Sequence, residues 1–453
     1  MMTPEELTQR IDQGFDTEVA FLTDLVKIQS ISSDSSKAGE VLRSAEFVRD
    51  SFASLGLDAV VRTAPMANGE PGRPAVIARS ERDPEKPTVL LYAHHDVQPV
   101  GDVSRWASDP FVAEIRDDRI YGRGTSDDGA GVAVHLSALK AFAGELPVNV
   151  IVYVEGEEEV GSPSFKSFLE TYRDQLEADV IIVADSGNWT TEIPAITSSL
   201  RGVSSVDVTV RVLEHAVHSG MFGGPILDAV TIASRLIATL HDEEGNVAVS
   251  GLGGSSVAEV DWSEEEYRRD ASVVDGYRLA GVGDLAARVW TMPAVSVIGM
   301  DVTTVEDSAN AIIPQCRFRL SMRTVPGVST ADSLKALKEH LTANVPFGAE
   351  ISVHSVEEGP SYTADLNSPE AEMLREALTS AYGAQAVAIG QGGSIPFIAE
   401  FERVFPEATV LVTGVEDPST NAHSEDESQS LAVLRNATLA EAFLLVELGR
   451  MGE

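Results

Sequence analysis

Three short apolar runs constrain the fold of this chain most strongly. They cover residues 88–92, 148–154 and 180–183, and segments with helical spacing of apolar residues separate them. Apolar runs of four to eight residues are typical of strands that are buried on both faces, as in parallel sheets covered by helices. The alternation predicts an α/β fold, in which a catalytic domain has a mainly parallel central sheet flanked by helices.

The pattern changes after residue 202. Residues 203–212 alternate apolar and polar side chains, which is typical of a strand with one solvated face in an antiparallel sheet. Helices at 225–240 and 330–341 and strands at 315–323 and 349–356 complete a smaller α+β domain, and residues 251–270 are expected to form a mobile loop. From about residue 363 the first pattern returns. We therefore expect a catalytic domain of residues 1–201 and 363–453, interrupted by an inserted domain of residues 202–362.

Composition excludes several classes of partner. The formal net charge is −38, and such a chain repels nucleic acids and anionic membrane surfaces. No apolar run is long enough to cross a bilayer, and the first residues lack the basic and apolar regions of a signal peptide. Cys316 is the one cysteine, so an internal disulfide is excluded. These features predict a cytoplasmic protein.

Residues of the types that bind metals follow the predicted strands. His94 and Asp96 come directly after the run at 88–92, and alternate residues of an extended segment point to the same face. Acidic residues also follow the runs at 148–154 and 180–183, the second group beginning with Asp185. Open α/β sheets place their sites at the carboxyl ends of strands, so these side chains are expected to converge.

Seven motifs occur in order along the chain. They are His94-x-Asp96, Gly122-Arg123-Gly124-x-x-Asp127, Glu158-Glu159-x-Gly161-Ser162, Asp185, His218-Ser219-Gly220, Arg323 and Ala422-His423-Ser424. Together they resemble the dinuclear zinc metallopeptidase family of aminoacylases, glutamate carboxypeptidases and carnosinase-type dipeptidases. The resemblance covers essentially the whole chain, and it implies that the inserted domain acts as a lid and forms a homodimer.

The resemblance implies two divalent metal ions in each subunit, Zn²⁺ in the first place and Mn²⁺ as the alternative. Asp127 would bridge both ions, with Glu159 and His423 completing one site and His94 and Asp185 the other. Nitrogen and carboxylate oxygen donors of this kind suit zinc, and a bridging anion reduces the repulsion between two cations. The family also has a cis peptide bond after the bridging aspartate, here Asp127-Asp128.

Two catalytic residues complete the implied centre. Glu158 would act as the general base on the attacking water, and Asp96 would orient His94 by accepting a hydrogen bond from its second ring nitrogen. Neighbouring acids leave alternatives open, because Asp128 competes with Asp127 and a shift of one residue would exchange Glu157 for Glu158. We interpret His95, Glu155 and the histidines outside the motifs as structural.

The resemblance also implies a set of substrate-binding residues: His218, Arg323, Asn310, Gly393 and Ser394. His218 would reach across the dimer to polarise the scissile carbonyl, and Arg323 would bind the carboxylate of the substrate, for which its planar fork is suited. Gly393 and Ser394 belong to a glycine-rich loop that approaches the same carboxylate. For Asn310, a hydrogen bond between the domains is an equal alternative to a place in the site.

The expected activity is metal-dependent hydrolysis of dipeptides, or of short peptides with a free C-terminal carboxylate. Residues 97–99, Trp106 and the long insert favour the dipeptidase branch over the deacylases. An N-acyl amino acid amidohydrolase is the nearest alternative, because the metal motifs of the two branches are shared. An inactive binding module is a third reading, and the presence of every proposed ligand and of the base argues against it.

Overall fold

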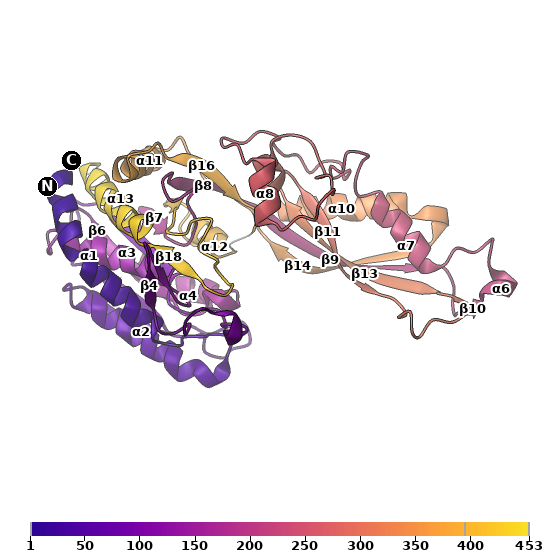
Figure 1. Cartoon of the computed structure of the whole chain (residues 1–453), viewed down its shortest axis with the longest axis horizontal. Helices are drawn as coiled ribbons and strands as arrows, with labels where there is room; N and C mark the ends of the chain where they lie inside the picture. The colour runs from indigo at the N-terminus through magenta and orange to yellow at the C-terminus, as the bar shows by residue number, and fades with distance from the viewer. Residues whose placement is uncertain (1, 394–395, 452–453) are drawn as a thin grey trace. The chain divides into compact units, whose positions relative to one another are not determined.

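The computed structural model describes residues 2–393 and 396–451, which form two compact units. Unit 1 comprises Met1–Ser198, Ala364–Ala388 and Phe397–Glu453, and unit 2 comprises Ser199–Thr363 and Ile389–Pro396. In Figure 1 the chain can be followed by its colour from one unit into the other and back. Ser394, predicted in the substrate loop, lies outside the described residues.

A six-stranded sheet with the order β1-β2-β6-β3-β7-β17 forms the centre of unit 1. The pairs β6/β3, β3/β7 and β7/β17 are parallel, whereas β1/β2 and β2/β6 are antiparallel. The predicted α/β fold with a mainly parallel sheet is therefore confirmed. The strands are β1 (Asp58–Arg62), β2 (Ala75–Arg79), β3 (Thr88–His94), β6 (Asn149–Glu155), β7 (Val180–Val183) and β17 (Thr409–Val412).

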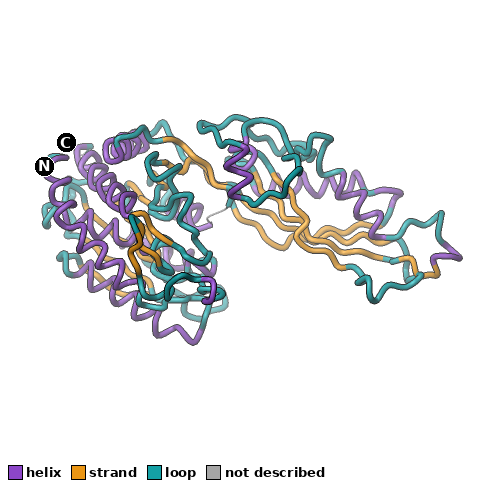
Figure 2. Tube along the Cα trace, in the orientation of Figure 1, coloured by secondary structure: helices purple, strands orange, loops and turns teal. Residues whose placement is uncertain are grey.

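Helices cover this sheet, as the purple segments of Figure 2 show for unit 1. The first helix begins at a capping box, in which the Thr3 side chain accepts a hydrogen bond from the backbone of Glu6. Its apolar stripe packs against α3 and α13. The helices of unit 1 are α1 (Pro4–Val26), α2 (Ala38–Ala53), α3 (Gly129–Ala141), α4 (Phe165–Thr171), α5 (Arg173–Leu176), α11 (Pro369–Tyr382), α12 (Pro396–Val404) and α13 (Leu431–Arg450).

Unit 2 is built on an antiparallel sheet with the order β11-β13-β9-β14. Alternate side chains are buried along β13 and along β9 from Val206 onward, and they pack together with helices α7 and α10, which confirms the predicted one-sided sheet. The elements are β9 (Gly202–Arg211), β11 (Ala294–Asp301), β13 (Gln315–Thr324), β14 (Glu350–Gly359), α7 (Ala229–Ala238) and α10 (Thr330–Asn344).

Smaller elements complete the chain. Sheets of two and three strands have the orders β10-β12, β15-β8-β16 and β18-β5-β4. Their strands are β4 (Glu114–Arg116), β5 (Arg119–Tyr121), β8 (Ala195–Leu200), β10 (Val217–His218), β12 (Ala311–Ile312), β15 (Tyr362–Thr363), β16 (Val387–Gln391) and β18 (Ser428–Ser430). The remaining helices are α6 (Ser219–Phe222), α8 (Glu264–Asp270) and α9 (Leu285–Trp290), with 3₁₀ turns η1 (Ser35–Lys37), η2 (Val103–Arg105), η3 (Glu158–Val160) and η4 (Pro346–Gly348).

Some predicted boundaries differ from those of the structure. The helix predicted at 225–240 begins only at Ala229, because Asp228 caps it by accepting a hydrogen bond from Thr231. Between the apolar runs at 148–154 and 180–183, where the sequence has a helical spacing, the structure has two short helices, α4 and α5. The region 251–270, predicted as a loop, ends in helix α8, which begins with a capping box at Ser263.

Candidate metal centre

Strand β3 ends at the centre of the site. Every residue from Val89 to His94 is buried, and β3 runs parallel to β6 and β7, so that His94 pairs with Glu155 and Tyr92 with Val183. The ends of the three strands therefore lie at one edge of the sheet, where Asp185 follows β7 and Glu158 follows β6. The predicted convergence of these segments is present in the structure.

Asp127 lies between two histidines. Its Oδ1 is 3.0 Å from His94 Nε2, and its Oδ2 is 2.8 Å from His423 Nε2. Burial alone would raise the pKa of this carboxyl, yet the hydrogen bonds with His423 and His94 lower it well below its usual value. One carboxylate thus faces two imidazoles with separate oxygens, which is the geometry of a bridging ligand.

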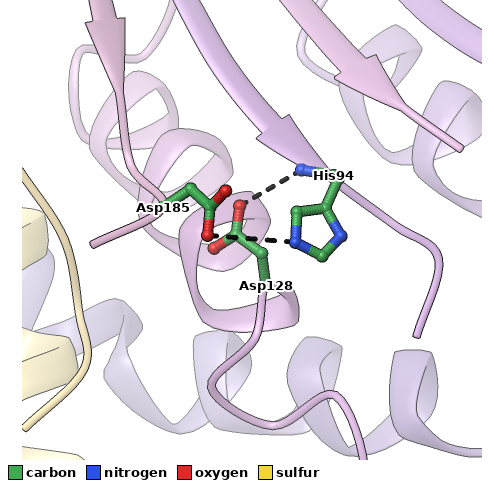
Figure 3. Close-up of side chains that lie close together, drawn as sticks. All are labelled: His94, Asp128 and Asp185. Atoms are coloured by element: carbon green, nitrogen blue, oxygen red, sulfur yellow. Dashed lines mark hydrogen bonds and ion pairs between the residues drawn. The ribbon is translucent and has the colours of Figure 1, made fainter. Parts of the chain in front are cut away.

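Asp128 faces the backbone instead. Figure 3 shows its carboxylate directed at the main-chain nitrogen of His94, which donates to Oδ2 at 3.1 Å. Its Oδ1 accepts a hydrogen bond from Gly131, so Asp128 is the N-cap of α3. The Asp127-Asp128 peptide bond is cis, as the resemblance implies. The geometry thus favours Asp127 over Asp128 as the carboxylate that faces both rings.

Two groups of side chains have their ligand atoms close enough to hold an ion. One is His94, Asp128 and Asp185, and the other is Asp127, Glu159 and His423, with the ligand atoms of each group within 4.8 Å of one another. In the first group, Asp185 Oδ1 is 3.9 Å from His94 Nε2, as Figure 3 shows. In the second, Glu159 Oε2 is 3.2 Å from His423 Nε2. Both oxygens of Asp128 accept backbone hydrogen bonds, so Asp127 is the better third donor for the first group.

The charge of the centre favours cations. Its ring of carboxylates comprises Asp96, Asp127, Asp128, Glu158, Glu159 and Asp185. Burial would lower the pKa of His94, but its bonds with Asp127 and Asp96 raise it well above the usual value. Hydrogen bonds with Asp127 and Glu159 raise the pKa of His423 to about 10. The donor set of imidazole nitrogens and carboxylate oxygens suits divalent zinc, so the residues present fit two such ions.

Glu158 differs from the two acids beside it. Burial is the largest cause that raises the pKa of Glu158 to about 7, with the negative charge of Glu159 as a further cause. Glu157 is occupied, because its Oε2 accepts from Arg73 N at 2.8 Å and its Oε1 accepts from Ser164 N. The raised pKa of Glu158 suits proton exchange near neutral pH, as the prediction of a general base requires.

Asp96 makes more contacts in the centre than the predicted one with His94. His94 Nδ1 lies 3.0 Å from the main-chain oxygen of Asp96 and 3.5 Å from its carboxylate. The carboxylate itself accepts hydrogen bonds from the backbone N–H groups of Glu158 and Glu159, at 3.1 and 3.2 Å. Asp96 therefore holds the turn with the base and a ligand, and its backbone carbonyl orients the ring of His94.

A buried ion pair behind the centre was not predicted. Arg123 Nη1 lies 2.6 Å from Glu427 Oε2, and the Glu427 carboxylate also accepts the backbone N–H groups of Gly124, Ser126 and Asp127. Arg123 donates further to the carbonyls of Pro99 and Ser424. This pair ties the segments that carry Asp127 and His423 to each other. Glu427 is the last residue of the acidic run Glu425-Asp426-Glu427, and such a run is typical of a solvated surface.

The predicted substrate residues of unit 2 fall into two places. His218 is exposed at the end of β10 and its Nδ1 accepts a hydrogen bond from Gly220 N, while the backbone oxygen of Asn310 accepts one from Ser219 N. Asn310 thus holds the segment that carries His218. Arg323 is half-buried near the end of β13, and Gly393 is exposed.

Arg201 is a second arginine near Arg323 that the sequence did not single out. It is 8% exposed, and its guanidinium donates to the carbonyl oxygens of Gly392 and Met292 at 3.2 and 3.3 Å. Burial and the neighbouring charge of Arg323 lower the pKa of Arg201 to about 10. Two arginine side chains therefore lie close to one another beside the glycine-rich segment, where an anion would be stabilised.

Known proteins match this chain in sequence and in fold. The model of peptidase family M20/M25/M40 matches residues 90–446. The chain is 33% identical to cysteinylglycine-S-conjugate dipeptidase of Corynebacterium striatum, over 95% of each chain. Its fold matches the dipeptidase Dug1p of Saccharomyces cerevisiae with a TM-score of 0.77 (22% identity) and human carnosine dipeptidase 1 with 0.74 (25% identity), each over 99% of both chains.

These relatives are dipeptidases, the branch that the sequence motifs predicted. Among the described residues, no helix is long and apolar enough to cross a membrane. The family match covers most of the chain, including every proposed metal ligand. This chain therefore belongs to peptidase family M20/M25/M40 and is a hydrolase.

Proposed function

We propose that this protein is a dinuclear metal-dependent dipeptidase, which hydrolyses dipeptides or short peptides with a free C-terminal carboxylate. The observation that carries the proposal is the placement of Asp127, with one oxygen toward His94 and the other toward His423. Glu158 follows strand β6 at the same edge of the sheet but belongs to neither group of possible metal ligands. The similarity to cysteinylglycine-S-conjugate dipeptidase and to carnosine dipeptidase supports this substrate class.

One metal ion would be held by His94, Asp127 and Asp185, and the other by Asp127, Glu159 and His423. Zinc is our assignment for both, with manganese as the alternative, since the donors suit either ion. Two such ions would polarise the scissile carbonyl and lower the pKa of the attacking water.

Glu158 is the proton carrier in the proposed reaction. It accepts a proton from the attacking water and passes it to the leaving nitrogen, so the amine departs as a neutral group. A base is most effective when its pKa lies near the working pH, and burial raises the pKa of Glu158 to about 7. Asp96 fixes the base by accepting the N–H of its backbone.

Substrate recognition is assigned to residues of unit 2. Arg323, with Arg201 beside it and Gly393 and Ser394 of the glycine-rich loop, would bind the C-terminal carboxylate of the substrate. His218 would donate a hydrogen bond to the carbonyl oxygen as negative charge develops on it, and Asn310 would hold the His218 segment. A donor placed in this way is worth about 2.7–4 kcal/mol of transition-state stabilisation.

We also propose a homodimer formed through unit 2. Strand β11 is an edge of the four-stranded sheet, and its Val297 and Ile298 side chains are 41% and 59% exposed. An exposed apolar edge strand is suited to pairing with a second chain.

We propose a cytoplasmic location. Cys316 is free and buried, which agrees with a reducing compartment.

Product analysis tests the proposed activity. The zinc-loaded protein is incubated with free dipeptides, including S-conjugated Cys-Gly and β-Ala-His, and with N-acyl amino acids, and the products are identified by mass spectrometry. We expect amino acids to appear from the free dipeptides alone. Cleavage of the acylated set alone would identify a deacylase, and no cleavage of either set would favour a binding module.

A further inference from the structure

Gln98 contacts a proposed metal ligand but has no role in the proposed reaction. Its side-chain amide nitrogen donates to Glu159 Oε2 at 2.7 Å and to the main-chain oxygen of Glu159 at 3.3 Å. One amide group thus directs both of its N–H bonds to a single residue. The carboxylate oxygen that it contacts is the one that faces His423 Nε2.

The backbone around Gln98 is held in place. Val97 N donates to Ser30 O at 3.0 Å, and Ser30 Oγ donates to His95 O at 2.7 Å. Val97 also packs against Gly124, where an added Cβ would come within 2.5 Å of a Val97 methyl group. The amide of Gln98 is therefore presented from a segment whose own position is fixed.

Glu159 is consequently fixed at three atoms by residues 96–98. Its backbone N–H bonds to Asp96, and its backbone oxygen and Oε2 bond to Gln98. A free glutamate side chain samples several rotamers, whereas this one is held with Oε2 toward His423. The donor is also neutral, so it brings no positive charge that would compete with a cation.

We infer that Gln98 is a positioning residue that orients the Glu159 carboxylate and thereby sets the metal affinity of the Asp127–Glu159–His423 site. This inference rests on the proposed dinuclear function. Both hydrogen bonds described for the amide go to Glu159, which belongs to one of the two ligand groups, so its removal acts on one of the two sites. Groups that hold a metal ligand in this way typically change the metal affinity by about 10–100-fold.

The test is stepwise metal binding in competition with a chelator, measured for the wild type and for Gln98→Met. Methionine keeps the length of the side chain and removes both N–H donors. We expect the affinity of one binding step to fall by about 10–100-fold and the other to stay unchanged. His423→Ala, which removes a ligand from the same site, identifies the affected step.

Two controls separate positioning from general stability. Gln175→Met replaces a half-buried glutamine on α5, away from the ligand loops, and should leave both steps unchanged. The Tm of the metal-free Gln98→Met protein should equal that of the metal-free wild type. Unchanged binding in Gln98→Met, or weaker binding at both steps together with a lower metal-free Tm, would overturn the inference. A wild type that binds fewer than two ions would instead contradict the proposed dinuclear function.

Discussion

At the scale of single residues, adjacent acids of the centre differ in the groups that their carboxylates contact. The sequence motifs contain His94, Asp127, Asp185, Glu159 and His423, which lie together in the structure. They left Asp127 and Asp128, or Glu157 and Glu158, as alternatives, because neighbouring residues of one type have the same chemistry. Backbone hydrogen bonds separate them in the structure: Asp128 caps α3, and Glu157 binds Arg73 N and Ser164 N.

Replacing Asp127 tests its shared role. Asp127→Ala removes a ligand from both proposed sites, so we expect the protein to lose both ions under dialysis conditions that leave two in the wild type. Asp128→Ala is the matched control, which should keep both ions and lose about 1 kcal/mol of stability with its helix cap. Metal analysis by mass spectrometry measures the content, and two ions in Asp127→Ala would refute the bridging assignment.

Replacing Glu158 separates catalysis from metal binding. Glu158→Gln keeps the shape of the side chain and removes the proton acceptor, so kcat should fall by about 10²–10⁴-fold. Both metal ions should remain, because Glu158 lies outside both ligand groups. Steady-state kinetics on a cleaved dipeptide, with metal content determined in parallel, provide the measurement. Wild-type turnover in this variant would remove Glu158 from the mechanism.

At the scale of helices and strands, the periodicity of apolar residues predicted the elements whose pattern is regular. It missed the elements whose pattern is interrupted. Strand β11 was not predicted, because a bulge between Val297 and Gly299 interrupts its alternation of inner and outer residues. The Arg123–Glu427 pair was missed because its acid looks like its solvated neighbours. Burial of a polar residue depends on tertiary contacts, which one sequence does not display.

Helix α1 carries a buried acid, Glu18, whose titration should appear in the stability of the protein. Burial raises the pKa of Glu18 to about 8, and Thr438 Oγ1 lies 2.6 Å from its Oε1. The usual glutamate value of 4.5 applies to the unfolded chain. The folded state thus keeps a proton that the unfolded state releases, so the contribution of Glu18 to stability is full below about pH 4.5 and is lost as the pH rises toward 8.

We expect Glu18→Gln to remove this pH dependence. The free energy of unfolding of the variant minus that of the wild type should increase between pH 5 and 8, by at most about 1.4 kcal/mol per pH unit. Urea unfolding of both metal-free proteins measures the difference. Exposed Glu5→Gln on the same helix is the control and should show a constant difference. A difference for Glu18→Gln that stays level with pH would mean that Glu18 ionises normally in the folded protein.

At the scale of the whole molecule, the change of pattern after residue 202 was enough to predict an inserted unit. The catalytic pattern resumes near residue 363, and the structure has its second unit in Ser199–Thr363. That unit also includes Ile389–Pro396, which the sequence did not indicate. The apolar residues of this glycine-rich segment have no periodicity that would assign it to either unit. Its association with unit 2 depends on contacts such as the hydrogen bond from the Arg201 guanidinium to the carbonyl oxygen of Gly392.

A mixing experiment tests the proposed role of His218 across a dimer. His218→Ala and Glu158→Gln should each be inactive, but a mixed dimer would contain one site with both residues intact. Random reassociation of twofold dimers should therefore restore about a quarter of wild-type activity. Subunit exchange is verified by native mass spectrometry with one variant isotopically labelled. Mixed dimers without activity would show that His218 serves its own chain.

The two histidines of the centre differ in their access to water. The His94 side chain is fully buried, whereas that of His423 is 58% exposed and lies on a loop after β17. Exchange of an ion requires that water or a competing ligand reach its coordination shell. The two ions should therefore leave at different rates, the one beside His423 before the one beside His94. Between the two losses the protein would be a one-metal species, with Asp127 bound to a single ion through one oxygen and in contact with His423 through the other.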